Sequence, residues 1–162
     1  MGFRIATWNI NSIRLREDLV CRFLADHLPD VLCLQELKSP TENIPRKKFF
    51  DLGYEYMCAR GQKSYNGVAL LSRLPIIEEG YHDFCSKGDA RHIFTIMEGG
   101  VEIHNFYVPA GGDIANRETN PKFAHKLDFL IEMRDFFKKK NGKKIILVGD
   151  LNIAPRPDDV WS

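Results

Sequence analysis

KKIILVGDLN, residues 143–152, is the stretch on which the fold prediction rests. Its apolar run, residues 145–148, lies between turn-forming residues, which is typical of a short strand buried on both faces. Gly149 then lets the backbone bend or lets another group approach closely. Asp150 and Asn152 follow two residues apart and project from the same face, because strand side chains alternate. Taken alone, this ending favours an Asx-rich turn, since Asp and Asn are common in turns.

Composition indicates one globular domain. The chain has 162 residues, 44% of them hydrophobic and 11% aromatic, which suffices for a core. With 23 basic and 22 acidic residues the net charge is +1, so charge alone gives no argument for a nucleic-acid partner. The four cysteines form no CxxC pair, which favours free thiols in a reducing compartment over a zinc site. The chain shows neither a secretory signal nor an apolar run of membrane-spanning length, so we expect a cytoplasmic protein without membrane contact.

Further strands and helices are expected along the chain. Apolar stretches predict strands at residues 3–10, 30–36, 54–59 and 67–72 and a hairpin at 94–108. Helical spacing predicts a helix that Pro29 stops, one that begins near Pro45, and one that Pro121 opens. This order predicts an α/β fold with one mixed sheet of about six strands and helices on one face. The apolar strands at 67–72 and 145–148 would then need cover on their second face that the chain does not obviously provide.

Several predicted strands end in oxygen-bearing side chains. These residues are Asn9, Glu36, Tyr107, Asp150 and Asn152. If the strand ends converge, the group contains carboxylates and amides without sulfur or imidazole, which suits Mg²⁺ or Mn²⁺ rather than zinc. Magnesium in proteins typically takes one or two carboxylates plus a phosphate of the substrate. Each residue alone has a simpler explanation as a loop, turn or core residue, and only the joint pattern indicates phosphodiester or phosphoryl chemistry.

Five motifs in a fixed order resemble the exonuclease III family of apurinic/apyrimidinic (AP) endonucleases, within the endonuclease/exonuclease/phosphatase superfamily. They are TWNIN (7–11), DVLCLQE (30–36), GQKSYNGVALLS (61–72), FYVPAG (106–111) and VGDLNIAP (148–155). The resemblance covers essentially all of the chain. It implies a DNA-repair phosphodiesterase, a Mg²⁺-dependent exodeoxyribonuclease III or AP endonuclease that hydrolyses the backbone of double-stranded DNA at abasic sites. It also implies the N-terminal half of a four-layer αββα sandwich.

The same resemblance implies a role for each site residue. Glu36 is expected to be the principal Mg²⁺ ligand, with Asn9 beside it. Asp150 is expected to orient and deprotonate the attacking water, and Asn152 to hold that water or the phosphate. Tyr107 is expected to contact the scissile phosphate. The expected metal ligands are therefore Asn9, Glu36, Asp150 and Asn152.

Contacts to the DNA backbone are expected from three residues outside this group. The resemblance implies a phosphate contact from Arg91. The loop that carries Gln62 and Lys63 offers further contacts of the DNA-acting branch.

Members of this family continue for roughly another half-chain, with a late Asp and a Ser-Asp-His motif, whereas this sequence ends at residue 162. We therefore expect residues 1–162 to be one domain of this type that lacks its C-terminal half and second sheet. Two other functions remain open: a phosphodiesterase acting on a non-DNA substrate, such as an inositol phosphate or phospholipid, and an inactive fragment. The chain alone is expected to be a poor catalyst that binds a complementary half or self-associates through an uncovered sheet face.

Overall fold

The computed structural model describes residues 2–140 and 142–159, which contain eight strands in two four-stranded sheets. The first sheet has the order β1-β2-β4-β3 and contains β1 (Ile5–Asn9), β2 (Val31–Gln35), β3 (Tyr56–Arg60) and β4 (Val68–Ser72). The second has the order β5-β6-β7-β8 and contains β5 (Ile76–Gly80), β6 (His92–Met97), β7 (Val101–Tyr107) and β8 (Lys144–Asp150). The helices are α1 (Ile13–His27), α2 (Arg46–Asp51) and α3 (Pro121–Lys138), with short 3-10 turns at Thr41–Asn43, Phe84–Ser86 and Pro157–Asp159.

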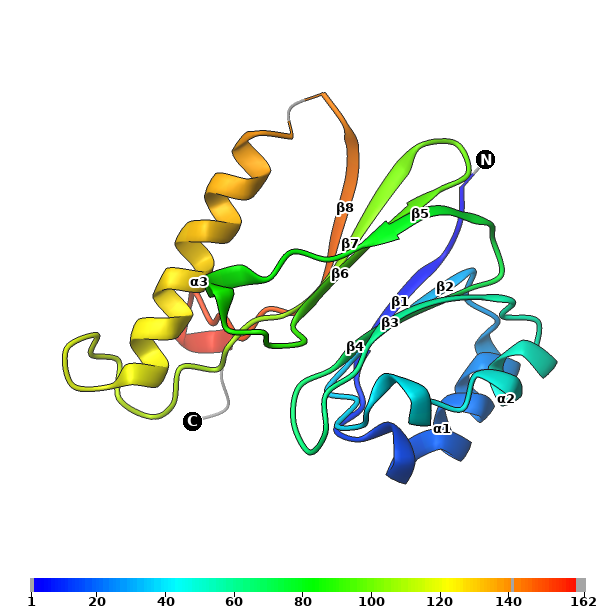
Figure 1. Cartoon of the computed structure of the whole chain (residues 1–162), viewed down its shortest axis with the longest axis horizontal. Helices are drawn as coiled ribbons and strands as arrows, with labels where there is room; N and C mark the ends of the chain where they lie inside the picture. Colours follow the sequence, from blue (N-terminus) through cyan, green and yellow to red (C-terminus); the bar gives the residue numbers. More distant parts are fainter. Residues whose placement is uncertain (1, 141, 160–162) are drawn as a thin grey trace.

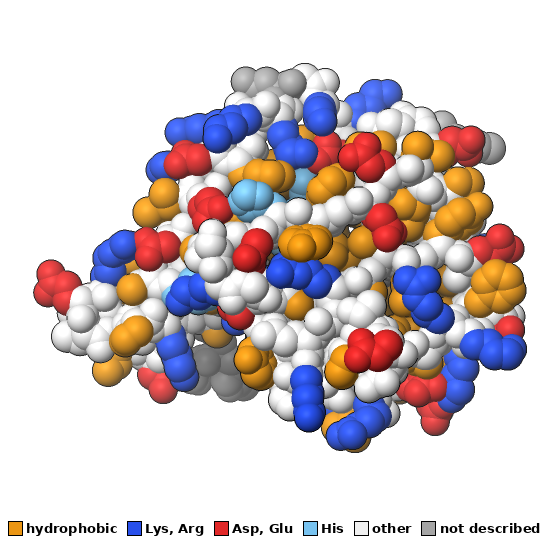
Figure 2. Space-filling model, viewed as in Figure 1, with side chains coloured by type: hydrophobic (Ala, Val, Ile, Leu, Met, Phe, Trp, Pro, Cys, Tyr) orange, Lys and Arg blue, Asp and Glu red, His pale blue; other side chains and the backbone are white. Residues whose placement is uncertain are grey.

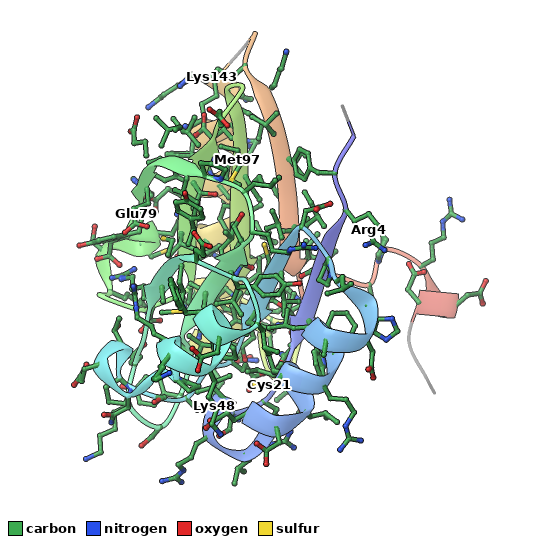
Figure 3. All side chains as sticks on the ribbon, turned by 90° about the vertical axis from the view of Figure 1, so that its right-hand side faces the viewer. Arg4, Cys21, Lys48, Glu79, Met97 and Lys143 are labelled. Carbon is green, nitrogen blue, oxygen red and sulfur yellow. The ribbon has the colours of Figure 1, made fainter. Side chains whose placement is uncertain are left out.

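The elements form four layers. Figure 1 shows the two sheets packed together, with α1 and α2 outside the first sheet and α3 outside the second. Figure 3 views the molecule from the side of the first helical layer, where Cys21 and Lys48 mark α1 and α2 in front of the first sheet. Both sheets are mixed, because β1 pairs with β2 and β7 with β8 in parallel while the other pairs are antiparallel.

Strand β2 shows how the layers are built from the sequence. Leu32 and Leu34 point to the helical layer and pack in the core that contains Val20 and Leu24 of α1. Val31 and Cys33 point the other way, into the core between the two sheets. All five residues of β2 are buried, as expected for a strand that is covered on both faces.

The α/β class and the αββα layering are confirmed, but the prediction of one six-stranded sheet with helices on one face is wrong. The strands divide into two sheets, and the second sheet covers the face of the first that was expected to be bare. All five residues of β4 are therefore buried. The prediction that β8 is buried on both faces holds only in part. Ile146 and Val148 pack between the sheets, whereas the Leu147 side chain on the opposite face is 36% exposed.

Helix α3 begins where its sequence predicted. Pro121 occupies the first turn, and the Asn120 side chain accepts hydrogen bonds from the backbone N–H groups of Lys122 (3.0 Å) and Phe123 (3.3 Å). Its buried Phe129 packs with Phe106 of β7, which fixes the helix against the second sheet.

The surface carries no concentration of one charge on the side shown in Figure 2, where basic and acidic side chains are interspersed. Among the described residues, no helix combines the length and the apolar character that a membrane crossing requires.

Candidate active site

The four strands that carry site residues end on the same side of the sandwich. The parallel pairing of β1 with β2 places Asn9 opposite Gln35, the neighbour of Glu36. The parallel pairing of β7 with β8 places Tyr107 opposite Asp150. One edge of each sheet therefore delivers polar side chains to the same place.

Three hydrogen bonds join these strand ends. The Nδ2 of Asn9 donates to Glu36 Oε1 and to Asp150 Oδ2, each at 2.8 Å. The phenol of Tyr107 donates to the same Glu36 oxygen at 2.9 Å. The two carboxylates thus lie within hydrogen-bonding distance of a single nitrogen atom, although they come from different sheets.

The backbone at Glu36 is held in an unusual conformation. Its φ is +55°, in the left-handed region that disfavours residues with a Cβ. Backbone N–H groups at the start of α1 fix the segment there, because N-cap Ser12 N donates to Glu36 O (2.7 Å) and Ile13 N donates to Leu37 O (3.0 Å). The start of α1 therefore turns Glu36 out of the strand direction and toward the other sheet.

Glu36 is surrounded by donors that favour its charged form. Lys38 Nζ lies 2.9 Å from Oε2 and also donates to Asn11 Oδ1. Burial by itself would raise the pKa of Glu36, but the hydrogen bonds from Asn9, Lys38 and Tyr107 outweigh it and lower the pKa of the carboxyl. Glu36 is therefore an anion at neutral pH.

Tyr107 and Arg91 lie on the side of the site that the second sheet forms. Burial, together with the hydrogen bond to Glu36, raises the pKa of Tyr107 to about 12, so the phenol keeps its proton at neutral pH. The Arg91 guanidinium lies 4.9 Å from the centre of the Tyr107 ring and donates to the Tyr107 carbonyl (3.2 Å). Asp89 orients it by accepting from Nε at 3.1 Å.

The end of β8 depends on a glycine. Gly149 has φ +136°, and a Cβ there would lie 2.0 Å from the carbonyl oxygen of Phe106, so no larger residue fits without displacing β7. Beyond it, Asp150 Oδ1 accepts from the Asn152 backbone N–H (3.1 Å), and Asn152 Nδ2 donates to Val108 O (2.8 Å). Asn152 therefore joins the ends of β7 and β8 beside the carboxylates.

A buried polar network lies between the sheets, directly beneath the site. Asn105 of β7 donates through Nδ2 to the backbone oxygens of Leu34 (3.0 Å) and Ala69 (2.9 Å) in the first sheet. Its Oδ1 accepts from Gln35 Nε2 at 2.7 Å, and the same nitrogen lies 3.0 Å from Thr7 Oγ1. This network fixes the second sheet against the first at the level of Glu36 and Tyr107.

The residues expected to contact DNA occupy different settings. Arg91 lies against Tyr107, as described. Gln62 is turned inward, where its Oε1 accepts from Ala90 N (3.1 Å) and Asn66 Nδ2 (2.9 Å), so it holds the loop that precedes Arg91. Lys63 is exposed. An open groove of about 770 Å³ runs beside the start of α1, and its basic lining residues are Arg14, Arg16, Lys38 and Lys63.

Several residues of the site were missed at the level of sequence. Lys38, Asn11 and Asn105 make contacts that no strand or helix pattern predicts. A usable signal did exist, because Lys38 and Asn11 each lie two residues beyond a predicted site residue, on the same polar strand ends.

The site offers hard oxygen ligands but few of them. Among residues 2–140 and 142–159, no group of three or more His, Cys, Asp or Glu side chains is arranged to hold a metal ion. Glu36 and Asp150 supply two carboxylates, which fits a magnesium ion that retains water and takes a phosphate from the substrate. Asn9 presents its nitrogen to the carboxylates, while its Oδ1 accepts from Asn11 N at 3.1 Å.

Three comparisons relate this geometry to known proteins. Residues 6–162 match the sequence pattern described as "Endonuclease/Exonuclease/phosphatase family". Exodeoxyribonuclease III of Haemophilus influenzae is 30% identical to this chain, and the match covers 97% of this chain and 60% of that protein. An AP endonuclease from Archaeoglobus fulgidus superimposes with a TM-score of 0.89 at 33% identity, over 99% of this chain and 62% of that one.

A third relative was solved with nucleic acid. A 3′ phosphatase from Neisseria, bound to a product DNA hairpin, superimposes with a TM-score of 0.86 at 30% identity, over 96% of this chain and 60% of that one. The chain thus spans about 60% of the length of these relatives. The family pattern extends over nearly the whole chain, and the two sheets bring the strand ends of that pattern into one site. The chain therefore belongs to the endonuclease/exonuclease/phosphatase family.

Proposed function

We propose that this chain forms the metal-binding half of the active site of a DNA-repair phosphodiesterase, of the exodeoxyribonuclease III or AP endonuclease type. The observation that carries the proposal is the convergence of Glu36 and Asp150 on the amide of Asn9, with the Tyr107 phenol on the same Glu36 oxygen. A buried core strand normally ends in a loop whose polar side chains face water. Here four strand ends from two sheets aim hydrogen-bonding groups at one point.

Mg²⁺, or Mn²⁺ in its place, would be held by Glu36 and Asp150 with help from the amides of Asn9 and Asn152. When bound, such an ion polarises a phosphoryl oxygen and stabilises the leaving alkoxide. The lowered pKa of Glu36 supports this role, because a carboxylate must be ionised to bind the cation. For Asn9 to use its oxygen, the side-chain amide would turn over.

The protein groups supply the remaining chemistry. Asp150 accepts a proton from the attacking water, and Asn152 positions the water or the phosphate, since both lie at the end of β8. Tyr107 remains protonated, and its hydroxyl donates a hydrogen bond to a phosphate oxygen as charge develops there. Arg91 and Lys63 contact phosphates of the DNA backbone, and Gln62 supports the Arg91 loop from behind.

Double-stranded DNA with an abasic site is the proposed substrate. The structural relative from Neisseria that holds a product DNA hairpin supports this choice over an inositol phosphate or a phospholipid. The basic groove that Arg14, Arg16 and Lys63 line beside the site also suits a polyanionic strand. The proposed location of such an enzyme is the cytoplasm.

A partner segment is proposed at the open edges of the sheets. The chain covers both sheet faces, so an uncovered face no longer supports self-association. Within the described residues, however, β1 and β8 each pair on one side only, and they pack against each other. β5, at the far edge, carries Glu78, Glu79 and a bulge, which discourage further pairing, whereas the interior of β8 carries no charge. A complementary half or a second copy would bind at the edge that β1 and β8 form.

Cleavage of a duplex that contains one abasic site, with Mg²⁺, tests the proposed function. This chain, Glu36→Gln and the control Glu42→Gln are compared, because Glu42 is an exposed glutamate away from the site. An undamaged duplex and a soluble phosphodiester serve as alternative substrates. We expect cleavage at the abasic site that Glu36→Gln removes and Glu42→Gln leaves intact. Preference for the soluble phosphodiester would contradict the DNA assignment.

A second measurement addresses the partner. Light scattering and cleavage are compared between this chain and one extended to the length of its relatives. We expect the 162-residue chain to self-associate and to cleave at least tenfold more slowly than the extended one. A monomer with activity within about tenfold, a difference of ~1.4 kcal/mol, would show that the edge needs no partner.

A further inference from the structure

One side chain of helix α3 contacts both loops that follow the site strands β7 and β8. Lys126 Nζ donates to the backbone oxygen of Asn152 (2.6 Å) and lies 3.3 Å from that of Ala110. Ala110 follows Tyr107 closely at the end of β7, and Asn152 follows Asp150 at the end of β8. A single ammonium group therefore ties two neighbouring strand ends together.

The loop after β7 is built to admit this side chain. Gly111 is buried and has φ +88°, and a Cβ there would lie 2.8 Å from Cδ of Lys126 and 3.3 Å from the Phe123 ring. Asn120 holds the same loop from the start of α3, because its Nδ2 donates to Gly111 O at 2.9 Å. The absence of a side chain at Gly111 thus leaves the space that the Lys126 stem occupies.

The ends of β7 and β8 also bond to each other directly. Asn152 Nδ2 donates to Val108 O, and Val108 N donates to Asp150 O at 2.9 Å. Val108 and Asn152 lie just beyond the ends of their strands, whereas Asp150 is the last residue of β8 and pairs with Tyr107. Lys126 connects both strand ends to a helix whose Phe129 is buried in the core on the second sheet.

We propose that Lys126 is a positioning residue of the active site. Its ammonium holds the ends of β7 and β8 at the separation at which Tyr107 and Asp150 act on one phosphate. The catalytic consequence rests on the proposed function, whereas the effect on the two loops does not. A displacement of about 1 Å in such an arrangement can reduce the rate about 10²-fold.

Amide hydrogen exchange tests the positioning without reference to catalysis. The Asn152 N–H donates to the Asp150 carboxylate and the Val108 N–H to the Asp150 carbonyl, so both amides report on the strand ends. Lys126→Met removes the donor and keeps the stem, while Lys126→Arg keeps a donor. Lys139→Met is the matched control, because Lys139 is exposed at the far end of α3.

We expect exchange of the Asn152 and Val108 amides to be at least tenfold faster in Lys126→Met, and within about threefold of the unmodified protein in Lys126→Arg and Lys139→Met. Equal acceleration in the Met and Arg variants of Lys126, or the same acceleration in Lys139→Met, would overturn the proposal. So would an unchanged exchange rate in Lys126→Met.

Cleavage kinetics then test the catalytic consequence. In Lys126→Met, kcat is expected to fall about 10- to 100-fold with KM within about threefold, since the reacting groups are misaligned while the DNA-binding surface is retained. A residue that merely stabilised the fold would leave kcat unchanged well below the melting temperature, and that result would overturn the catalytic part. If the unmodified protein does not cleave the duplex, the proposed function fails, but the exchange result still decides the role of Lys126 in the loops.

Discussion

Replacing Asn105 with leucine should loosen the contact between the sheets and with it the site. Asn105 is fully buried, donates to the carbonyl oxygens of Leu34 and Ala69, and accepts from Gln35. Leucine has a similar shape but makes none of these three bonds. Glu36 comes from the first sheet and Tyr107 from the second, so a looser contact between the sheets separates them.

The structure sets the size of the effect. Each lost hydrogen bond lowers the free energy of unfolding by about 1 kcal/mol, so three of them account for about 3 kcal/mol. Gln35 keeps its contacts to Thr7 and to the Cys33 carbonyl, which limits the penalty for its unpaired donor. The burial of a more apolar side chain recovers part of the loss. We therefore expect a net loss of about 2–3 kcal/mol, or a melting temperature lower by roughly 4–12 °C for a chain of this size.

Urea unfolding of a double-mutant cycle is the assay. The set contains Asn105→Leu, Gln35→Leu and the double variant. Asn43→Leu serves as the control, because Asn43 is exposed and should change stability by less than about 0.5 kcal/mol. In the double variant neither partner is left unpaired, so its loss should be smaller than the sum of the single losses by about 1 kcal/mol or more. A loss below about 1 kcal/mol for Asn105→Leu, or strictly additive losses, would show that Asn105 does not hold the two sheets together.

Three further predictions follow from the site and the core. Glu36→Ala should raise the Mg²⁺ concentration needed for half-maximal cleavage at least tenfold, and more than Asn9→Ala does. A Mg²⁺ titration curve equal to that of the unmodified protein would remove Glu36 from the metal site. Gly149→Ala should lower stability by about 3 kcal/mol or more, seen as a fall in melting temperature, because its Cβ would collide with the backbone of β7. Burial lowers the pKa of His92 to about 2 and that of His104 to about 4. Below the ordinary histidine pKa of about 6.5, the unfolded chain therefore binds more protons than the folded chain. The free energy of unfolding should decrease as the pH is lowered through this range, by up to about 1.4 kcal/mol per pH unit for each histidine. Unfolding free energies that stay level between pH 7 and 5 would contradict this.

Local patterns were sufficient for the strands that carry the site. The apolar run before Asp150 and the one before Glu36 predicted strands, and the structure contains β8 and β2 at these places. The close approach suggested by Gly149 is also present, as the contact with Phe106. Such features are encoded within a few neighbouring residues, so a single sequence reveals them.

The division into two sheets could not be predicted in this way. Val31 and Cys33 face a second sheet while Leu32 and Leu34 face helices, and an apolar side chain is equally suited to either neighbour. Strand β5 was missed because its sequence, IIEEG, places two apolar and then two acidic residues together instead of alternating them. The second layer therefore went unrecognised, although the chain contains it.

The gathering of the site residues was more predictable than their individual contacts. Polar side chains at strand ends predicted one shared site, and the structure brings Asn9, Glu36, Tyr107 and Asp150 together. The inward orientation of Gln62 depends on the backbone of a distant loop, which no local pattern describes. Predicting such contacts requires knowing which layers face each other.

The left-handed backbone at Glu36 has a consequence for protein engineering. A residue with a Cβ loses about 1–2 kcal/mol in that conformation, whereas glycine does not, so Glu36→Gly should unfold less readily than Glu36→Ala. Among replacements of Glu36, stability thus favours glycine, whereas the proposed activity requires the glutamate. A library of variants selected for heat resistance alone will enrich glycine over alanine among substitutions at position 36, and it must be screened for cleavage in the same round if the glutamate is to be retained.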